Sequence, residues 1–205
     1  MSNEIDTIMF SLFGTLIRKP TLRKNLINLL ISGMGNININ LEKHHLLTTK
    51  YETFKEYTQD RFKKKIQDNL LLEFEKEINK TEYFDGTEKY LESLKSQDYR
   101  MIIVDDIPYP YKEIINSLGL EKLVNGVILS CEEGVTKSKG ELYNAAFDKF
   151  NINPHNCVVV GEDYQLDHIL PKKLGTSSIQ INRKTAVKSY QIGKLSQLVS
   201  KIKTL

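Results

Sequence analysis

The hydroxyl of Ser11 stands directly after the first apolar run of the chain and just ahead of a glycine–threonine pair at Gly14 and Thr15. A serine hydroxyl acts as a nucleophile only when a general base removes its proton. The four histidines, which could serve as that base, lie elsewhere in the sequence, at positions 44, 45, 155 and 168. We therefore expect no covalent catalysis by Ser11.

Five short apolar runs, rich in β-branched residues, predict the strands that position the polar side chains. They are Ile5–Phe10, Met101–Val104, Val127–Leu129, Cys157–Val160 and the weaker Ser178–Ile181. Runs this apolar suit a parallel sheet that helices cover on both faces. Helical patterns alternate with them over Thr87–Ser96, Tyr111–Leu118, Lys139–Phe150 and Gln165–Leu174, as βαβ units require. The predicted fold class is α/β, with Ile5–Phe10 as a central strand.

Residues 18–80 interrupt this alternation, because they contain no clear strand pattern. Helical periodicity appears in the leucines at positions 22, 26, 29 and 30, and again from Phe54 to Phe74. Gly33–Asn36 predicts a turn after the first of these helices. We interpret the basic run at positions 61–65 as a solvated helix face rather than a nucleic-acid patch. The segment is predicted to be a helical insertion.

Length and composition exclude several classes of protein. A chain of 205 residues with 40% hydrophobic content suits one sizeable core. The net charge of +3 is too close to balance to indicate nucleic-acid binding by itself. No apolar stretch is long enough to predict a membrane span. The acidic opening at residues 1–6 lacks the order of a secretory signal. Cys131 and Cys157 are expected to be buried small hydrophobes, and the expected location is cytoplasmic.

The string from Ile8 to Leu16 resembles the opening motif of the haloacid dehalogenase (HAD) superfamily, in which a strand delivers a nucleophilic aspartate ahead of a glycine–threonine turn. Three later segments resemble the second, third and fourth motifs in the same order: Met101–Asp106, Gly134–Lys137, and Val158–Asp163 followed by Asp167. The resemblance covers essentially the whole chain. It implies a Rossmann-like, five-stranded parallel sheet formed by residues 1–17 and 81–205, with residues 18–80 as the helical cap. It also implies an active site at the carboxyl ends of the strands.

Two positions differ from what the resemblance implies for a reactive site. Ser11 stands in the place of the nucleophilic aspartate, and Phe13 in the place of the aspartate that phosphatases use as general acid and base. Dehalogenases also carry an aromatic residue there, so Phe13 alone would only change the substrate class. Together the two residues remove both reactive carboxylates, and we expect neither to be active.

Asp105 and Lys137 occupy the second and third motif positions. Asp105 replaces the serine or threonine that holds the substrate anion in the family. A carboxylate about 4 Å from a phosphate oxygen costs about 1–4 kcal/mol per charge pair, so anion binding should suffer. Lys137 is predicted to pair with Asp105 or Glu162. The alternatives are that Asp106 caps the following helix and that Lys137 is a solvated side chain.

The acids of the fourth motif leave the question of Mg²⁺ open. Mg²⁺ prefers oxygen ligands in octahedral geometry, and the family's site also uses the carboxylate that is missing at position 11. One interpretation is a weak site built from Asp105, Glu162 and Asp167; the other is that magnesium affinity is poor.

These departures favour a HAD-like protein with impaired catalysis that retains a role in binding a small anionic ligand or a protein partner. The alternative is a hydrolase of the phosphatase or dehalogenase class that acts on a small anionic substrate by an altered mechanism, for instance through a metal-bound water at Asp105 and Glu162. Neither a membrane nor a nucleic acid is expected as a partner.

Overall fold

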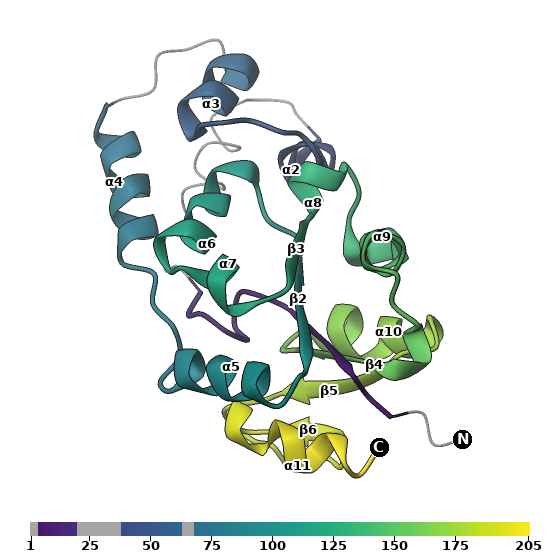
Figure 1. The fold of residues 1–205 in the computed structure, drawn as a ribbon. Helices are drawn as coiled ribbons and strands as arrows, with labels where there is room; N and C mark the ends of the chain where they lie inside the picture. The colour runs from purple at the N-terminus through teal and green to yellow at the C-terminus, as the bar shows by residue number, and fades with distance from the viewer. Residues whose placement is uncertain (1–3, 20–37, 63–67) are drawn as a thin grey trace.

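The computed structural model describes residues 4–19, 38–62 and 68–205, and its centre is one parallel sheet (Figure 1). Its strands are β1 (Thr7–Phe10), β2 (Arg100–Asp105), β3 (Gly126–Leu129), β4 (Cys157–Gly161), β5 (Ser177–Ile181) and β6 (Gln191–Ile192). They lie in the order β3-β2-β1-β4-β5-β6, and every neighbouring pair is parallel. The α/β fold class and the interior position of β1 are confirmed, with six strands rather than five.

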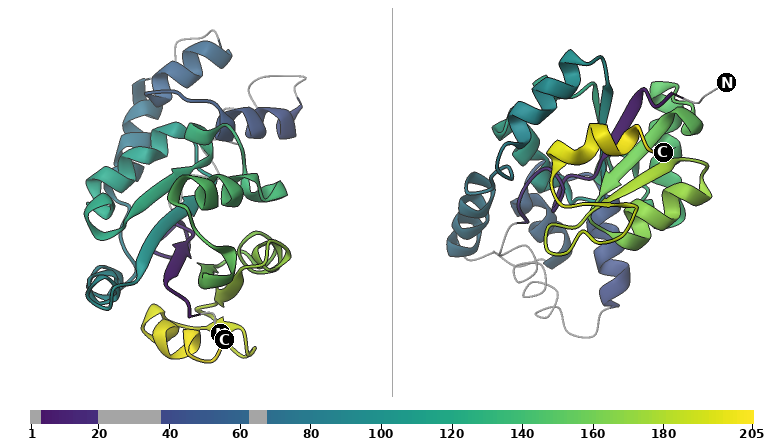
Figure 2. Two further views of the ribbon diagram at one scale, coloured as in Figure 1. Left: turned by 45° about the vertical axis from the view of Figure 1, so that its right-hand side comes forward. Right: turned by 90° about the horizontal axis from the view of Figure 1, so that it is seen from below.

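Side chains alternate along the strands and build a separate core on each face of the sheet. In β1, Ile8 and Phe10 belong to one buried cluster and Met9 to the other. The first core is covered by α5 (Thr87–Ser96), α6 (Glu113–Ser117), α7 (Leu120–Leu123) and α11 (Leu198–Ile202). The second is covered by α9 (Glu141–Phe150) and α10 (Leu170–Lys173). Helices therefore lie on both sides of the sheet (Figures 1 and 2), as continuous apolar strands require.

Helix boundaries differ from the predicted ones where the backbone leaves α-helical geometry. A 3₁₀ turn at Tyr109–Lys112 precedes α6, and a second at Lys137–Lys139 precedes α9. A π-helix over Tyr164–Ile169 leads into α10. The short helix α8 (Ser130–Glu133) follows β3 directly. Two further 3₁₀ turns, Pro154–Asn156 and Leu195–Gln197, precede β4 and α11.

The described part of the predicted insertion, residues 18–19, 38–62 and 68–80, contains helices and no strand. The helices are α2 (Ile39–Thr48), α3 (Phe54–Phe62) and α4 (Asp68–Asn79). The predicted leucine-patterned helix, the turn at residues 33–36 and positions 63–65 of the basic run lie outside the described residues. Phe74 of α4 packs edge-on against Tyr111, with 5.1 Å between ring centroids, so α4 contacts the main core. We retain the division into a cap and a core as a proposal.

Two expectations from composition can be compared directly with the structure. Cys131 and Cys157 are buried and free, and burial raises the pKa of each thiol to about 12. Within the described residues, none of the helices combines the length and apolar character that crossing a bilayer needs.

Candidate functional site

Lys137 lies at the centre of a buried polar cluster at the carboxyl ends of β1, β2 and β4. Its ammonium Nζ donates to Ser11 Oγ at 3.0 Å and lies 3.1 Å from Asp105 Oδ1 and 2.9 Å from Asp167 Oδ1. Only 2% of the Lys137 side chain is exposed. We call Ser11, Asp105, Lys137 and Asp167 the lysine cluster. The predicted pair between Lys137 and Asp105 is confirmed, whereas the solvated lysine is wrong.

The carboxylate of Asp105 fills the position where the loop after β1 could receive an anion. Its Oδ2 accepts the backbone N–H groups of Leu12 at 2.9 Å and Phe13 at 3.1 Å. Its Oδ1 accepts the N–H of Asp106 at 2.9 Å and faces Lys137. Successive N–H groups with a nearby ammonium form the kind of concave site that binds anions. Here, an internal carboxylate already satisfies these donors.

Asp167 reaches the lysine cluster because a π-helix sets its direction. The side chain of Asp163 caps this helix by accepting the N–H groups of Gln165 and Leu166. Asp167 Oδ1 accepts the hydroxyl of Tyr143 at 3.1 Å, and Oδ2 accepts the N–H of Asp163 at 3.1 Å. A Cβ at position 161 would lie 2.1 Å from Asp167 Oδ2, so a glycine is required there. Single-turn π segments frequently mark functional sites.

Tyr143 is the member of this network that the sequence does not reveal. It lies on the buried face of α9, where its spacing matches the apolar residues around it. Burial raises the pKa of its hydroxyl well above the usual value, so the group stays neutral and donates to Asp167. Nothing in a single sequence separates such a tyrosine from an ordinary core aromatic residue.

Electrostatics keep Lys137 charged. Burial alone would favour the neutral amine, but the carboxylates of Asp105 and Asp167 outweigh that effect and raise the pKa of Lys137 well above its usual value. Two carboxylates and one ammonium give the lysine cluster a net negative charge. It is therefore unsuited to receive a further anion.

Asp106 supports Lys137 through the backbone rather than capping a helix. Its Oδ1 accepts the N–H of Lys137 at 2.9 Å, and the 3₁₀ turn that follows starts at Tyr109 with Pro108 before it. The expected helix cap is therefore wrong. Burial, with the charges of Asp105 and Asp167, raises the pKa of Asp106 to about 6, although the Lys137 N–H and ammonium oppose this.

Replacing Asp106 by asparagine should change how stability depends on pH. The folded state holds the Asp106 proton more tightly than the unfolded chain, so the resulting stabilisation is complete below about pH 4 and lost as pH rises through about 6. Asp106→Asn keeps the acceptor oxygen but cannot ionise. We therefore expect the free energy of unfolding of the variant, relative to that of the wild type, to increase by about 2 kcal/mol when the pH is raised from 4 to 7.5. Urea unfolding at both pH values measures this. Exposed Asp148→Asn is the control, and an equal stability difference at both pH values for Asp106→Asn would contradict the assignment.

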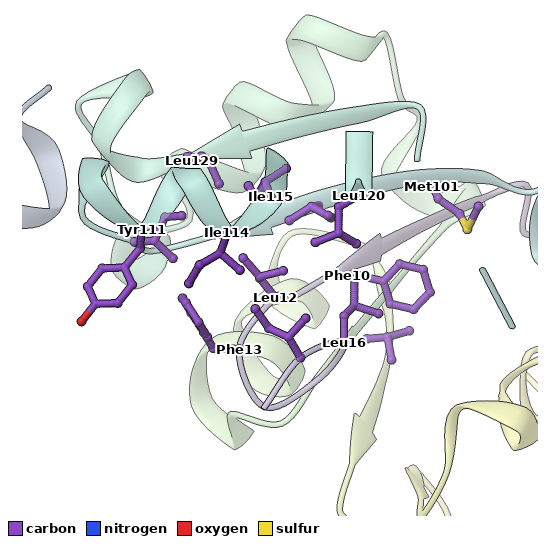
Figure 3. Packing of buried hydrophobic residues seen from close by; sticks show 14 of the residues in the cluster. Phe10, Leu12, Phe13, Leu16, Met101, Tyr111, Ile114, Ile115, Leu120 and Leu129 are labelled. Atoms are coloured by element: carbon purple, nitrogen blue, oxygen red, sulfur yellow. The ribbon is translucent and has the colours of Figure 1, made fainter. Parts of the chain in front are cut away.

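Glu162 and Phe13 do not join the lysine cluster. Glu162 forms an ion pair with Lys19, and its carboxylate packs so closely on Gly14 (φ 77°) that a Cβ there would lie 2.1 Å from it. Of the two partners predicted for Lys137, the structure shows Asp105 rather than Glu162, and Asp167 is its second acidic partner. Phe13 is 4% exposed and points into the apolar cluster shown in Figure 3, where it packs edge-on against Tyr111.

The geometry of the acids does not fit a Mg²⁺ ion. Both oxygens of Asp105 and of Asp167 accept protein donors, and the Lys137 ammonium stands between these carboxylates, where a cation would lie. Glu162 faces Lys19. Across residues 4–19, 38–62 and 68–205, no three histidine, cysteine or acidic side chains gather in a way that could hold a metal. The structure therefore does not bring Asp105, Glu162 and Asp167 together as ligands.

Millimolar Mg²⁺ should leave the melting temperature almost unchanged. A ligand at or below its Kd adds no more than about 0.4 kcal/mol of stability, which shifts Tm by about 1–2 °C in a chain of this size. Thermal unfolding with and without the ion measures this, with Ca²⁺ as the control for non-specific ionic effects. A rise of several degrees that disappears in Glu162→Ala would show that these acids rearrange around the metal.

Comparison with known proteins gives a consistent family. A model of the haloacid dehalogenase-like hydrolases matches residues 5–167. Haloacid dehalogenase-like hydrolase domain-containing protein 3 of Xenopus laevis is 26% identical over 103 residues, which cover 50% of this chain and 42% of that protein. Glyceraldehyde 3-phosphate phosphatase of Pyrococcus furiosus is 30% identical over 95 residues, which cover 46% of this chain and 40% of that protein. The match thus spans less than half the length of either relative.

A solved structure extends the likeness to nearly the whole fold. The crystal structure of a HAD phosphatase from Thermococcus onnurineus matches with a TM-score of 0.70 over 95% of this chain and 96% of that one, at 20% identity. At this identity the likeness shows the fold alone. Family membership is compatible with Mg²⁺, which HAD hydrolases typically use, although the acids described above are otherwise engaged. Because the family model matches well over half of the sequence, the chain belongs to the haloacid dehalogenase-like hydrolases.

Proposed function

We propose that this chain is a catalytically impaired member of the family, with a role in binding a small anionic ligand or a protein partner. The observation that carries the proposal is the position of Asp105. Its carboxylate accepts the N–H groups of Leu12 and Phe13 and pairs with Lys137, so these anion-binding donors are internally satisfied. A phosphate or carboxylate substrate would have to displace a charged side chain of the protein from this position.

The environment of Ser11 further supports impaired catalysis. Ser11 Oγ lies 3.3 Å from Asp105 Oδ1, which is long for an O–H···O hydrogen bond, and that oxygen already faces Lys137. Lys137 lies closer, at 3.0 Å, but a lysine acts as a base only when it is neutral. Since the raised pKa keeps Lys137 protonated, neither neighbour is suited to take the Ser11 proton.

A second candidate is a hydrolase that acts on a small anionic substrate by an altered mechanism. One observation favours it: Ser11, Lys137 and an acid lie in contact at the strand ends, and serine–lysine pairs are catalytic in some unrelated enzymes. The phosphatase relative from Pyrococcus furiosus agrees with this class. The candidate requires Lys137 to lose its proton inside a cluster of negative charge.

Hydrolysis assays distinguish the two candidates. We expect turnover of p-nitrophenyl phosphate and of a short haloacid to be indistinguishable from buffer. Position 11 carries a hydroxyl instead of a carboxylate, and of the two groups beside Ser11 Oγ, Lys137 is protonated and Asp105 is paired with Lys137. Ser11→Ala serves as the matched variant and should give the same background. Robust hydrolysis by the wild type that Ser11→Ala abolishes would overturn the proposal and make Ser11 a nucleophile.

A further inference from the structure

α5 and the C-terminal segment that carries β6 and α11 lie side by side (Figures 1 and 2). Residues of both segments line a basic groove that contains no member of the lysine cluster. Its volume is about 640 Å³, within the range of small-molecule sites. Arg18, Lys89, Arg183 and Lys194 line it. We propose that this α5–β6 groove binds a small organic phosphate, such as a nucleoside diphosphate.

The groove carries an excess of positive charge. Asp85 is the single acidic residue among the groove's lining residues, against the four basic ones. Asp85 pairs with Arg18 at 2.9 Å, but the Asp85 side chain is 96% exposed, so solvent screens this ion pair and it offsets little of the charge. A ligand with two or more negative charges would balance the remaining cations.

Two arginines are held close together by one aromatic ring. The guanidinium carbons of Arg183 and Arg18 lie 3.5 Å and 5.1 Å from the centroid of the Phe84 ring. Burial and the charge of Arg18 lower the pKa of Arg183 to about 10, because both disfavour the charged guanidinium. A phosphate between them would relieve their repulsion, and guanidinium groups suit phosphate oxygens.

Arg183 is oriented by hydrogen bonds to two backbone carbonyl oxygens. It donates to the carbonyl oxygens of Gly14 at 2.5 Å and Thr15 at 2.6 Å. Both acceptors are neutral, and these bonds use two of the five N–H donors of a guanidinium. Arg183 is thus fixed on the loop that follows Ser11 while it retains donors for a ligand.

The remaining walls of the groove suit the organic part of such a ligand. Tyr90 and Leu195 contribute apolar surface beside the basic residues, and the Tyr90 hydroxyl is held by the N–H of Val199. Gly86 lines the groove without a side chain, and a Cβ there would meet no atom within 4 Å. Open space beside an aromatic wall can take a planar or apolar group.

This proposal rests on the proposed function in one respect: it places the binding of a small anionic ligand in the α5–β6 groove. No member of the lysine cluster lines the groove, so binding here does not depend on whether Ser11 is reactive. The two proposals fail separately, because one is tested by turnover and the other by ligand affinity.

Isothermal titration of the full chain with ADP, adenosine and inorganic phosphate tests the site. We expect ADP to bind with a Kd below about 1 mM and at least about tenfold more tightly than either fragment. The double variant Arg18→Gln/Lys194→Gln should weaken ADP binding at least about tenfold, because Arg18 and Lys194 are lost from the groove. Lys173→Gln/Lys203→Gln, which removes two exposed lysines outside the groove, should bind ADP as the wild type does.

The location of binding is checked by amide chemical shifts. ADP should shift the signals of Gly86 and Gly193, which line the groove, and those of Gly14 and Thr15, whose carbonyls hold Arg183. Absence of ADP binding, or equal weakening in both double variants, would overturn the proposal. Phosphate binding as tight as that of ADP would contradict the role of Tyr90 and Leu195.

Discussion

Replacing Lys137 by methionine should lower the free energy of unfolding by about 3–5 kcal/mol. The change keeps most of the side-chain volume but removes the ammonium that lies 3.1 Å from Asp105 and 2.9 Å from Asp167. Both carboxylates would remain buried without a cation, and removing one partner of a buried ion pair leaves an uncompensated charge. Urea unfolding at pH 7.5 measures the loss.

Lys149→Met provides the control for removing a lysine from an ion pair. Lys149 lies 3.0 Å from Glu133, but its side chain is 55% exposed, and such surface pairs contribute at most about 1 kcal/mol. If Lys137→Met does not fold, Lys137→Met/Asp167→Asn should recover folding, because Lys137 and one of its two acidic partners are then neutralised together. A loss below about 1 kcal/mol for Lys137→Met would contradict a structural role for the lysine cluster.

The sequence was sufficient to predict the sheet because its interior strands are buried on both faces. β1, β2 and β4 read as apolar runs for that reason. The ends of β1 and β2 place Ser11 and Asp105 beside Lys137, which comes from the 3₁₀ turn before α9. The sequence analysis did not predict β6, because this strand has only two residues, one of them Gln191. Two residues at the edge of a sheet carry no periodicity that could distinguish them from a loop.

The choice between Glu162 and Asp167 could not be made from the sequence. Both acids belong to the same motif, and only the π-helix at Tyr164–Ile169 turns Asp167 toward Lys137. Glu162 instead meets Lys19 and the space that Gly14 leaves open. The direction of each side chain depends on the local backbone geometry, and the helical sequence pattern over this segment does not show that the helix is a π-helix.

The sequence predicted that Asp105 opposes anion binding, but it did not predict the hydrogen bonds that Asp105 accepts. A carboxylate at this position implied repulsion of an anionic substrate, and that follows from charge alone. Its bonds to the N–H groups of Leu12 and Phe13 depend on the tight turn after β1, where the N–H groups of Leu16 and Ile17 point back to the carbonyl of Leu12. The structure thus shows Asp105 as a bound internal anion rather than a distant repelling charge.

Asp105→Ser should convert this closed position into an anion site. The variant removes the negative charge and the carboxylate to which the N–H groups of Leu12 and Phe13 donate. It leaves Lys137 beside them with Asp167 as an acidic partner. Removing repulsion worth about 1–4 kcal/mol per charge pair corresponds to a gain in phosphate affinity of at least about fivefold. Asp148→Ser, which removes an exposed aspartate, is the control for the change in net charge.

Phosphate titration followed by the amide signals of Leu12 and Phe13 tests most directly whether Asp105 fills the anion position. Neither residue lines the α5–β6 groove, whose occupation is followed separately by the signals of Gly86 and Gly193. We predict saturable shifts of both signals in Asp105→Ser, and none in the wild type or in Asp148→Ser at the same phosphate concentrations. Saturable shifts of the Leu12 and Phe13 amides in the wild type, with an affinity equal to that of Asp105→Ser, would contradict the internal-anion assignment.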